Sequence, residues 1–456
     1  MMLPDTLTGD ADEGQKPSLM RAAMIEFGLS RKMSAGVGVA IAFMLLARAS
    51  NACGAVQGDA SLIPFDEETS SYAKAKDTSL IARLQDRIDR GEVKLRHDDQ
   101  YGYLLSLFDE LKVSTNSQLL VFSKTSLQRE RIGPKTPRAL YFNDDVYLGF
   151  IPGAPFIEVS GMDPRLGGVF YSIEQGKKNG RPKFVRNDQC LECHTSTKTL
   201  GVAGPLVRSF ATDEAGVVDL SSGTSLVNHR TPLNERWGGW YVTGTHGAQP
   251  HRGNLIGQSA IARHKKEPGY HGNQTDLKRL LDTSIYPVPS SDIVALMTLE
   301  HQAHMQNFLT RLNQDSTAAL QQFGHLNHLK NVIEGFLKYL LFTEEAPLSA
   351  PIKGSSAFVQ QFEALGPKDT RGRSLRQFDL KTRLFKYPCS YLIYSEAFNA
   401  LPQKLRENLY QRLWEILTGQ DTDPAFARIP AEHRRAILEI LTETKEELPS
   451  YWKRKN

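Results

Sequence analysis

The residues Cys190-Leu191-Glu192-Cys193-His194 constrain this chain of 456 residues more than any other feature of its sequence. On a helix, positions i, i+3 and i+4 lie on one face, so both thiols and the imidazole point the same way. Two thiols at this spacing can form thioethers with the two vinyl groups of one porphyrin, while the histidine reaches the iron. The motif therefore predicts one covalently bound haem c. Cys190 and Cys193 would be the attachment points and His194 the proximal iron ligand.

Two other kinds of site use a Cys-x-x-Cys pair. A zinc site needs a second ligand pair close by, and the other cysteines, Cys53 and Cys389, are isolated and distant in the sequence. A thioredoxin-like pair needs a strand before it and a helix that opens on it, and no such pattern surrounds the motif. Haem attachment is the favoured interpretation of the three. For Cys389 we expect a free buried thiol.

The N-terminal fifty residues have the order of a secretory signal peptide. Arg31-Lys32 precedes a twelve-residue apolar run, Ala35 to Leu46, and small residues follow it. This run is shorter than the ~20 residues that cross a membrane comfortably. We expect residues 1–49 to be a signal peptide or a short membrane anchor, and residues 50–76 to be a tether. The protein would then be periplasmic or exported. Cleavage, a membrane tether and a lipid anchor at the N-terminus stay open as alternatives.

The remaining pattern predicts an α+β protein with a small antiparallel sheet and a mostly α-helical C-terminal domain. Residues 77–175 would form helices plus the sheet, with helices at Thr78–Arg90 and Tyr101–Leu111 and strands at Gln118–Ser123, Ala139–Phe142, Val146–Ile151, Phe156–Ser160 and Gly168–Ile173. Residues 176–272 would be a loop-rich haem-binding segment. Residues 273–456 would be helical, with helices at Thr275–Leu281, Ser291–Asn313, His325–Phe342, Ala357–Leu365, Ser390–Ala400, Lys404–Thr418 and Pro430–Thr444.

Composition limits the partners. A net charge of +4 without a cluster of Lys and Arg gives no reason to expect a nucleic acid. Hydrophobic residues at 40% and charged residues at 23% are typical of a soluble globular chain. We expect the partner to be a redox protein or a small-molecule electron donor or acceptor.

A sixth iron ligand is less clearly indicated than the fifth. His246, in the Gly-rich and aromatic stretch 237–247, is our first candidate for a distal ligand, and His229 is the second. Met162, Met297 and Met305 are further candidates. Arginine matches a carboxylate with two parallel hydrogen bonds, so three nearby arginines are candidate partners of the haem propionates: Arg230, Arg236 and Arg252.

Four histidines of the predicted helical domain fall at helical spacing: His301 and His304 on one expected helix, and His325 and His328 on the next. Two facing helices with two histidines each could bind a second metal. Histidines that pack or form hydrogen bonds in the core are the alternative, and the sequence does not decide between them.

Longer stretches of the chain resemble a known group of proteins. The segment Pro182 to Gly247 contains CLECH, VRSFATDEAGVVDLSSGTSLVNHR and RWGGWYVTGTHG, and it resembles a family of exported bacterial cytochrome c-type proteins with a single haem motif. The stretches DIVALMTLEHQAHMQN and LKTRLFKYPCSYLIYSEAF are similar to the same family. The resemblance implies haem c binding and electron transfer, with Cys190, Cys193 and His194 as haem residues, and no particular substrate.

We therefore expect an exported monohaem c-type cytochrome that transfers single electrons. Whether it is an enzyme stays open, because a haem-dependent, peroxidase-like oxidoreductase with an open distal site would carry the same motif. A haem-based sensor is a third interpretation, although no output domain is evident.

Overall fold

The computed structural model describes Tyr72 and residues 74–176 and 180–453 of the chain. The chain divides into two units, Met1–Gln57 and Gly58–Asn456, and every described residue belongs to the second. The predicted signal peptide, residues 1–49, and nearly all of the predicted tether, residues 50–76, lie outside the described residues.

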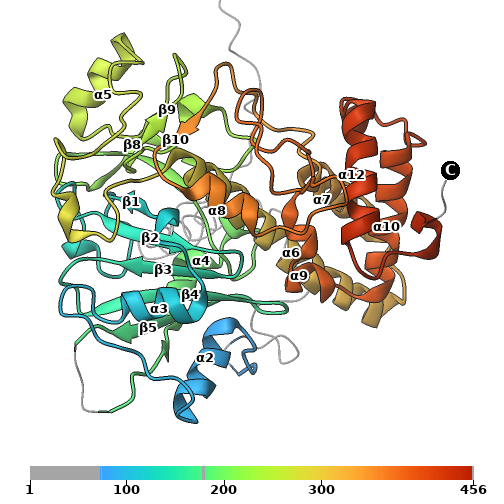
Figure 1. Cartoon of the computed structure of the whole chain (residues 1–456), viewed down its shortest axis with the longest axis horizontal. Coiled ribbons are helices and arrows are strands. Elements are labelled where there is room, and N and C mark those ends of the chain that lie inside the picture. The colour runs from blue at the N-terminus through green and yellow to red at the C-terminus, as the bar shows by residue number, and fades with distance from the viewer. Residues whose placement is uncertain (1–71, 73, 177–179, 454–456) are drawn as a thin grey trace, which may run out of the picture. The chain divides into compact units, whose positions relative to one another are not determined.

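A six-stranded antiparallel sheet forms the centre of the N-terminal half, and its strands follow one another in chain order from β1 to β6. Figure 1 labels the first five of them. The strands are β1 (Leu119–Val121), β2 (Arg138–Phe142), β3 (Val146–Phe150), β4 (Phe156–Asp163), β5 (Gly167–Glu174) and β6 (Val185–Arg186). The five predicted strands correspond to β1 to β5. Short runs rich in Val, Ile, Phe and Tyr, broken by Asn, Asp, Pro and Gly, made them recognisable in the sequence.

The two faces of this sheet have different coverings. One face presents apolar side chains such as Tyr141 and Leu148 to α2 (Leu80–Asp89) and α3 (Leu104–Leu111), with which they form one hydrophobic cluster. On the opposite face Leu119, Val121 and Phe142 join the core of the C-terminal half. That second face also carries the polar residues that lie next to the Cys-x-x-Cys-His motif.

The segment after the sheet contains more regular structure than its sequence predicted. It holds α4 (Leu191–His194), the hairpin of β7 (Arg208–Thr212) and β8 (Val218–Leu226), β9 (Gly244–Thr245) and α5 (Gly257–Lys266). Strand β9 pairs with β10 (Lys353–Gly354), so this segment and the C-terminal half share a small sheet.

The C-terminal half is helical, which confirms the predicted α+β class. Its helices are α6 (Ile293–Phe323), α7 (Lys330–Leu340), α8 (Phe358–Ala364), α9 (Glu396–Asn399), α10 (Gln403–Thr418), α11 (Pro424–Ala427) and α12 (Ala431–Thr444). Helix α6 begins where the Asp292 side chain accepts hydrogen bonds from the amides of Val294 and Ala295, and it ends at Gly324 in the left-handed conformation. It crosses the middle of the molecule between the sheet and helices α10 and α12 (Figure 1).

Some predicted helices differ from the observed ones. Residues 275–281 form turns rather than a helix, because the Asp276 carboxylate accepts a hydrogen bond from the amide of Lys278 and competes with the helical pattern. The stretch Ser390–Ala400 divides into a 3-10 helix (Tyr391–Tyr394) and α9, since the Ser395 side chain starts a new helix by accepting a bond from the amide of Phe398. Helix α6 runs ten residues beyond the predicted end at Asn313 and stops only at Gly324.

Candidate haem-attachment site

The Cys-x-x-Cys-His motif forms one helical turn. A 3-10 helix, η3 (Asp188–Cys190), continues directly into α4, and the side chain of Asn187 caps this turn by accepting a hydrogen bond from the amide of Gln189 at 3.2 Å. Cys193 is exposed, while Cys190 and His194 are partly exposed, and neither thiol forms a disulfide. Neither thiol is paired, and burial raises the pKa of the Cys190 thiol to about 11. At positions i, i+3 and i+4 of one helical turn, the two thiols and the imidazole are expected to lie on the same side.

The hydrogen bond of the His194 ring determines which of its nitrogens can bind a metal. Nδ1 lies 2.9 Å from the carbonyl oxygen of Gly204, and a carbonyl only accepts, so Nδ1 carries the hydrogen and donates. Nε2 then holds a lone pair, and no described group makes a hydrogen bond to it. Burial lowers the pKa of His194 and outweighs the opposite effect of the Gly204 bond, so the ring is neutral at pH 7. A neutral imidazole with a fixed tautomer and a free Nε2 is the form that binds iron.

The polar face of the sheet lies beside this turn. Arg138 on β2 and Glu158 on β4 form a half-buried ion pair of 2.7 Å that crosses over β3. The pair can form because β3 has Gly149 at the crossing, where a Cβ would stand 3.3 Å from the Cβ of Glu158. The Arg138 guanidinium lowers the pKa of His194 and the Glu158 carboxylate raises it, so both charges act on the imidazole. The Phe170 ring of β5 lies against the imidazole, with 4.7 Å between the ring centroids.

The β7–β8 hairpin places a further cation near the second thiol. The Arg208 guanidinium is close enough to Cys193 for the thiol to influence its pKa. It donates a hydrogen bond to Thr224 Oγ1 at 2.8 Å and lies over the Phe210 ring at 4.3 Å. None of the described carboxylates forms an ion pair with it. Arg208 is thus a net positive charge at the edge of the motif.

Several buried polar atoms around the motif have no hydrogen-bond partner: Arg138 Nε, Ser160 Oγ, Thr195 Oγ1 and Arg208 Nε. Such atoms are rare in proteins, and each calls for a missing partner. The unpartnered atoms include two guanidinium donors and two hydroxyls, which can bind carboxylates. They belong to the same part of the chain as two free thiols and an imidazole lone pair. A haem has groups that match these, with two vinyl groups for the thiols, an iron for the imidazole and two propionates. The residues present therefore fit the predicted haem.

Two of the three arginines that the sequence analysis chose for the propionates, Arg230 and Arg236, are engaged elsewhere. Arg236 is buried in an ion pair with Glu300, whose other oxygen accepts a hydrogen bond from Trp237 Nε1 at 3.0 Å. Arg230 pairs with Glu344 at 3.0 Å. Arg138 and Arg208 lie near the motif instead, and sequence reasoning missed both. In the sequence, Arg138 and Arg208 are marked only as arginines within strand segments. Their closeness to the motif depends on how the strands pair, which the sequence does not show.

The predicted distal ligand, His246, belongs to a group of four histidines that we call the histidine cluster: His246, His251, His264 and His271. Neighbouring rings in it have centroids 4.6, 5.3 and 4.9 Å apart. Nε2 of His246 accepts a hydrogen bond from the amide of Asn273 at 2.9 Å, which leaves the ring hydrogen on Nδ1. None of these contacts includes His194 or its neighbours. The distal role of His246 stays a prediction that the observed contacts do not support.

The second candidate, His229, lies in the core of the helical domain. Its Nδ1 is hydrogen-bonded to Nδ1 of His301 at 2.8 Å, and Nε2 of His301 is bonded to Ser390 Oγ at 2.8 Å. The His229 ring is stacked on Tyr339 with 4.0 Å between centroids. These contacts place His229 and His301 in the core, although Nε2 of His229 has no hydrogen-bond partner among the described residues.

The structure does not bring the two predicted histidine pairs together. His304 packs on Tyr339, with 4.8 Å between ring centroids, whereas His325 and His328 are exposed in the turn between α6 and α7 and contact Phe323. Across the described part of the chain, no group of three or more His, Cys, Asp or Glu side chains is arranged to hold a metal ion.

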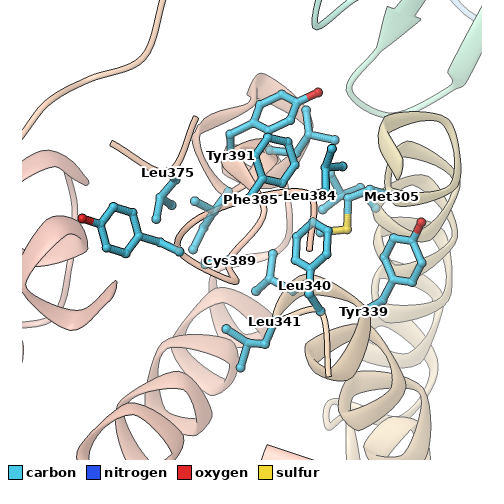
Figure 2. Packing of buried hydrophobic residues seen from close by; sticks show 14 of the residues in the cluster. Met305, Tyr339, Leu340, Leu341, Leu375, Leu384, Phe385, Cys389 and Tyr391 are labelled. Carbon is cyan, nitrogen blue, oxygen red and sulfur yellow. The ribbon is translucent and has the colours of Figure 1, made fainter. Parts of the chain in front are cut away.

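Cys389 and two of the candidate methionines are core residues. Cys389 is fully buried among apolar side chains that include Leu341 and Leu375, as Figure 2 shows, and it forms no disulfide with a described residue. Burial raises the pKa of its thiol to about 12, so it is unreactive. Met297 and Met305 belong to the same hydrophobic cluster, while Met162 lies on β4.

Comparison with known proteins adds no further guidance. No protein-family model, no curated protein and no solved structure matches this chain. Within the described residues, no helix is both long enough and apolar enough to span a membrane.

Proposed function

We propose that this protein is an exported c-type cytochrome that binds one haem covalently and transfers single electrons. The observation that carries the proposal is the His194 ring, whose Nδ1 is held by the Gly204 carbonyl at 2.9 Å, while Nε2 makes no hydrogen bond with a described group and the motif carries two unpaired thiols. A histidine that is bonded at Nδ1 and makes no hydrogen bond at Nε2, in one short motif with two unpaired cysteines, supports the role of a metal ligand. Export belongs to the proposal because covalent haem attachment in bacteria takes place outside the cytoplasmic membrane.

Each residue of the site has a separate part in this function. Cys190 and Cys193 anchor the porphyrin through thioethers, and His194 binds the metal and is oriented by Gly204. When bound, the haem supplies an iron that changes reversibly between the ferric and ferrous states. Arg208 places a positive charge nearby, which favours the state with one more electron. Because Cys193 is exposed, electrons can be exchanged near the surface with a redox protein or a small molecule.

Covalent attachment is tested by producing the chain together with a cytochrome c maturation system. The wild type is expected to gain the mass of one haem and to keep peroxidase staining on a denaturing gel. The double variant Cys190→Ala/Cys193→Ala is expected to lose both, because no thioether can form. Cys389→Ala is the matched control, since it removes a thiol that is buried in the hydrophobic core and is expected to leave the stain. A wild type without covalent haem, or a stain that persists in the double variant, would refute the proposal.

A haem oxidoreductase with an open distal site is the second candidate function. The contacts of the candidate sixth ligands favour it, because neither histidine contacts the motif. His229 is hydrogen-bonded in the helical core, and Nε2 of His246 accepts a hydrogen bond from the amide of Asn273. Rapid binding of CO or cyanide to the purified protein would support this enzyme, whereas a six-coordinate low-spin spectrum would support the electron carrier.

A further inference from the structure

Helix α6 lies along the loop that follows the motif, residues 195–205, which we call the haem loop. Asn307 Nδ2 donates a hydrogen bond to the carbonyl oxygen of Pro205 at 2.8 Å. One helical turn later, Arg311 Nη1 donates to the carbonyl oxygen of Leu200 at 2.9 Å. These residues are four positions apart, so they project from one face of the helix and hold the loop at two points.

The first of these points, Pro205, directly follows Gly204, the residue that orients the proximal histidine. Gly204 accepts the hydrogen bond of His194 Nδ1 and also donates its own amide to the His194 carbonyl, both at 2.9 Å. The side chain of Asn307 packs directly on it, because a Cβ on Gly204 would stand only 1.9 Å from Asn307 Oδ1. Only glycine fits between the imidazole and this helix.

Asn307 is built into this contact and has no exposed surface for another purpose. It is 1% exposed, and its Oδ1 receives no hydrogen bond from a described group. A buried amide oxygen without a donor costs folding free energy. We therefore look for the role of Asn307 in the loop that it holds.

We propose that Asn307, supported by Arg311, is a positioning residue for the haem: from α6 it holds the haem loop and thereby the hydrogen bond between His194 and Gly204. The inference rests on the proposed function. A hydrogen bond from Nδ1 to a carbonyl raises the basicity of the metal-binding nitrogen and stabilises the ferric state. The central helix of the C-terminal half thus sets the reduction potential of a group attached to another part of the chain.

The test compares Asn307→Ala with Asn313→Ala in the full, haem-loaded chain. Asn313 is a matched control, because it lies on the same helix, is 6% exposed and donates to the carbonyls of Pro164 and Ala400, neither of which belongs to the haem loop. The midpoint potential is measured by redox titration, and amide hydrogen exchange is followed in the peptide that contains residues 195–207. Covalent haem is measured separately by mass.

Asn307→Ala is expected to keep its haem. Its loop amides are expected to exchange hydrogen faster than those of the wild type, and its midpoint potential is expected to be higher. The expected change is about tenfold in the reduction equilibrium, which is about 59 mV for one electron. Asn313→Ala is expected to leave both properties unchanged. If Asn307→Ala does not fold, Arg311→Gln takes its place with the same expected direction, since it removes the second hold on the loop.

The outcomes separate the two proposals. A variant that carries haem at the wild-type potential, with wild-type exchange in the loop, overturns the positioning role and leaves the proposed function intact. A wild type that gains no covalent haem overturns both.

Discussion

The histidine cluster allows one prediction in which the magnitude follows from the structure. His271 is 5% exposed and shares a hydrogen bond of 2.9 Å with His264. Burial, with smaller contributions from His264 and His246, lowers its pKa from 6.5 to about 4. The Arg252 guanidinium contributes to lowering the pKa of the neighbouring His264. Replacing His271 by Gln removes this titration and keeps a neutral polar side chain.

The sign of the effect follows from the two pKa values. Between pH 6.5 and 4 the unfolded chain binds a proton at His271 and the folded chain does not, so stability falls as the pH is lowered. The contribution of this residue is fully present above pH 6.5. At pH 5 it is reduced by about 2 kcal/mol, and below pH 4 by about 3 kcal/mol.

Urea unfolding of the wild type and His271→Gln at pH 8 and pH 5 tests this reasoning. The variant is expected to be less stable at pH 8, because it loses packing and the bond to His264. That difference is expected to shrink by about 2 kcal/mol at pH 5, since the wild type alone is penalised there. His328→Gln, at an exposed position, is expected to show no such change. An equal difference at both pH values for His271→Gln would contradict a buried neutral histidine.

Three further predictions concern the site and the core. Gly204→Ala is expected to destabilise the protein by about 1–3 kcal/mol in urea unfolding, because its Cβ meets Asn307 Oδ1 at 1.9 Å. Gly335→Ala, where nothing lies within 4 Å, is expected to stabilise the helix by about 0.5–1 kcal/mol instead. Arg236→Ala is expected to cost about 3–5 kcal/mol at pH 8, since it leaves Glu300 buried without its cation. Burial raises the pKa of Glu300 to about 7, so the cost measured at pH 5, where this carboxyl is protonated, is expected to be clearly smaller. In the haem-loaded protein, Arg208→Gln is expected to lower the midpoint potential, and an unchanged potential would exclude its electrostatic role.

Helices and strands that are determined by the local pattern of residues were predicted correctly. The strands β1 to β5 are short runs of β-branched and aromatic residues between turn residues, and helices such as α10 and α12 show helical periodicity in their apolar residues. Helix α5 and strand β8 were missed, since α5 has a single fully buried residue and β8 has none. Their structure depends on contacts with the rest of the chain.

The amino-acid sequence alone determined the chemistry of the motif, because two thiols and an imidazole on one helical turn are a local arrangement. Only the tertiary structure decided which nitrogen of His194 is free, since the carbonyl of Gly204 lies ten residues away along the chain. It also decided that Arg138, Arg208 and Asn307 are the neighbours of the motif and its loop. These contacts join a strand, a hairpin and a helix far apart in the chain, and packing of the whole core brings them together.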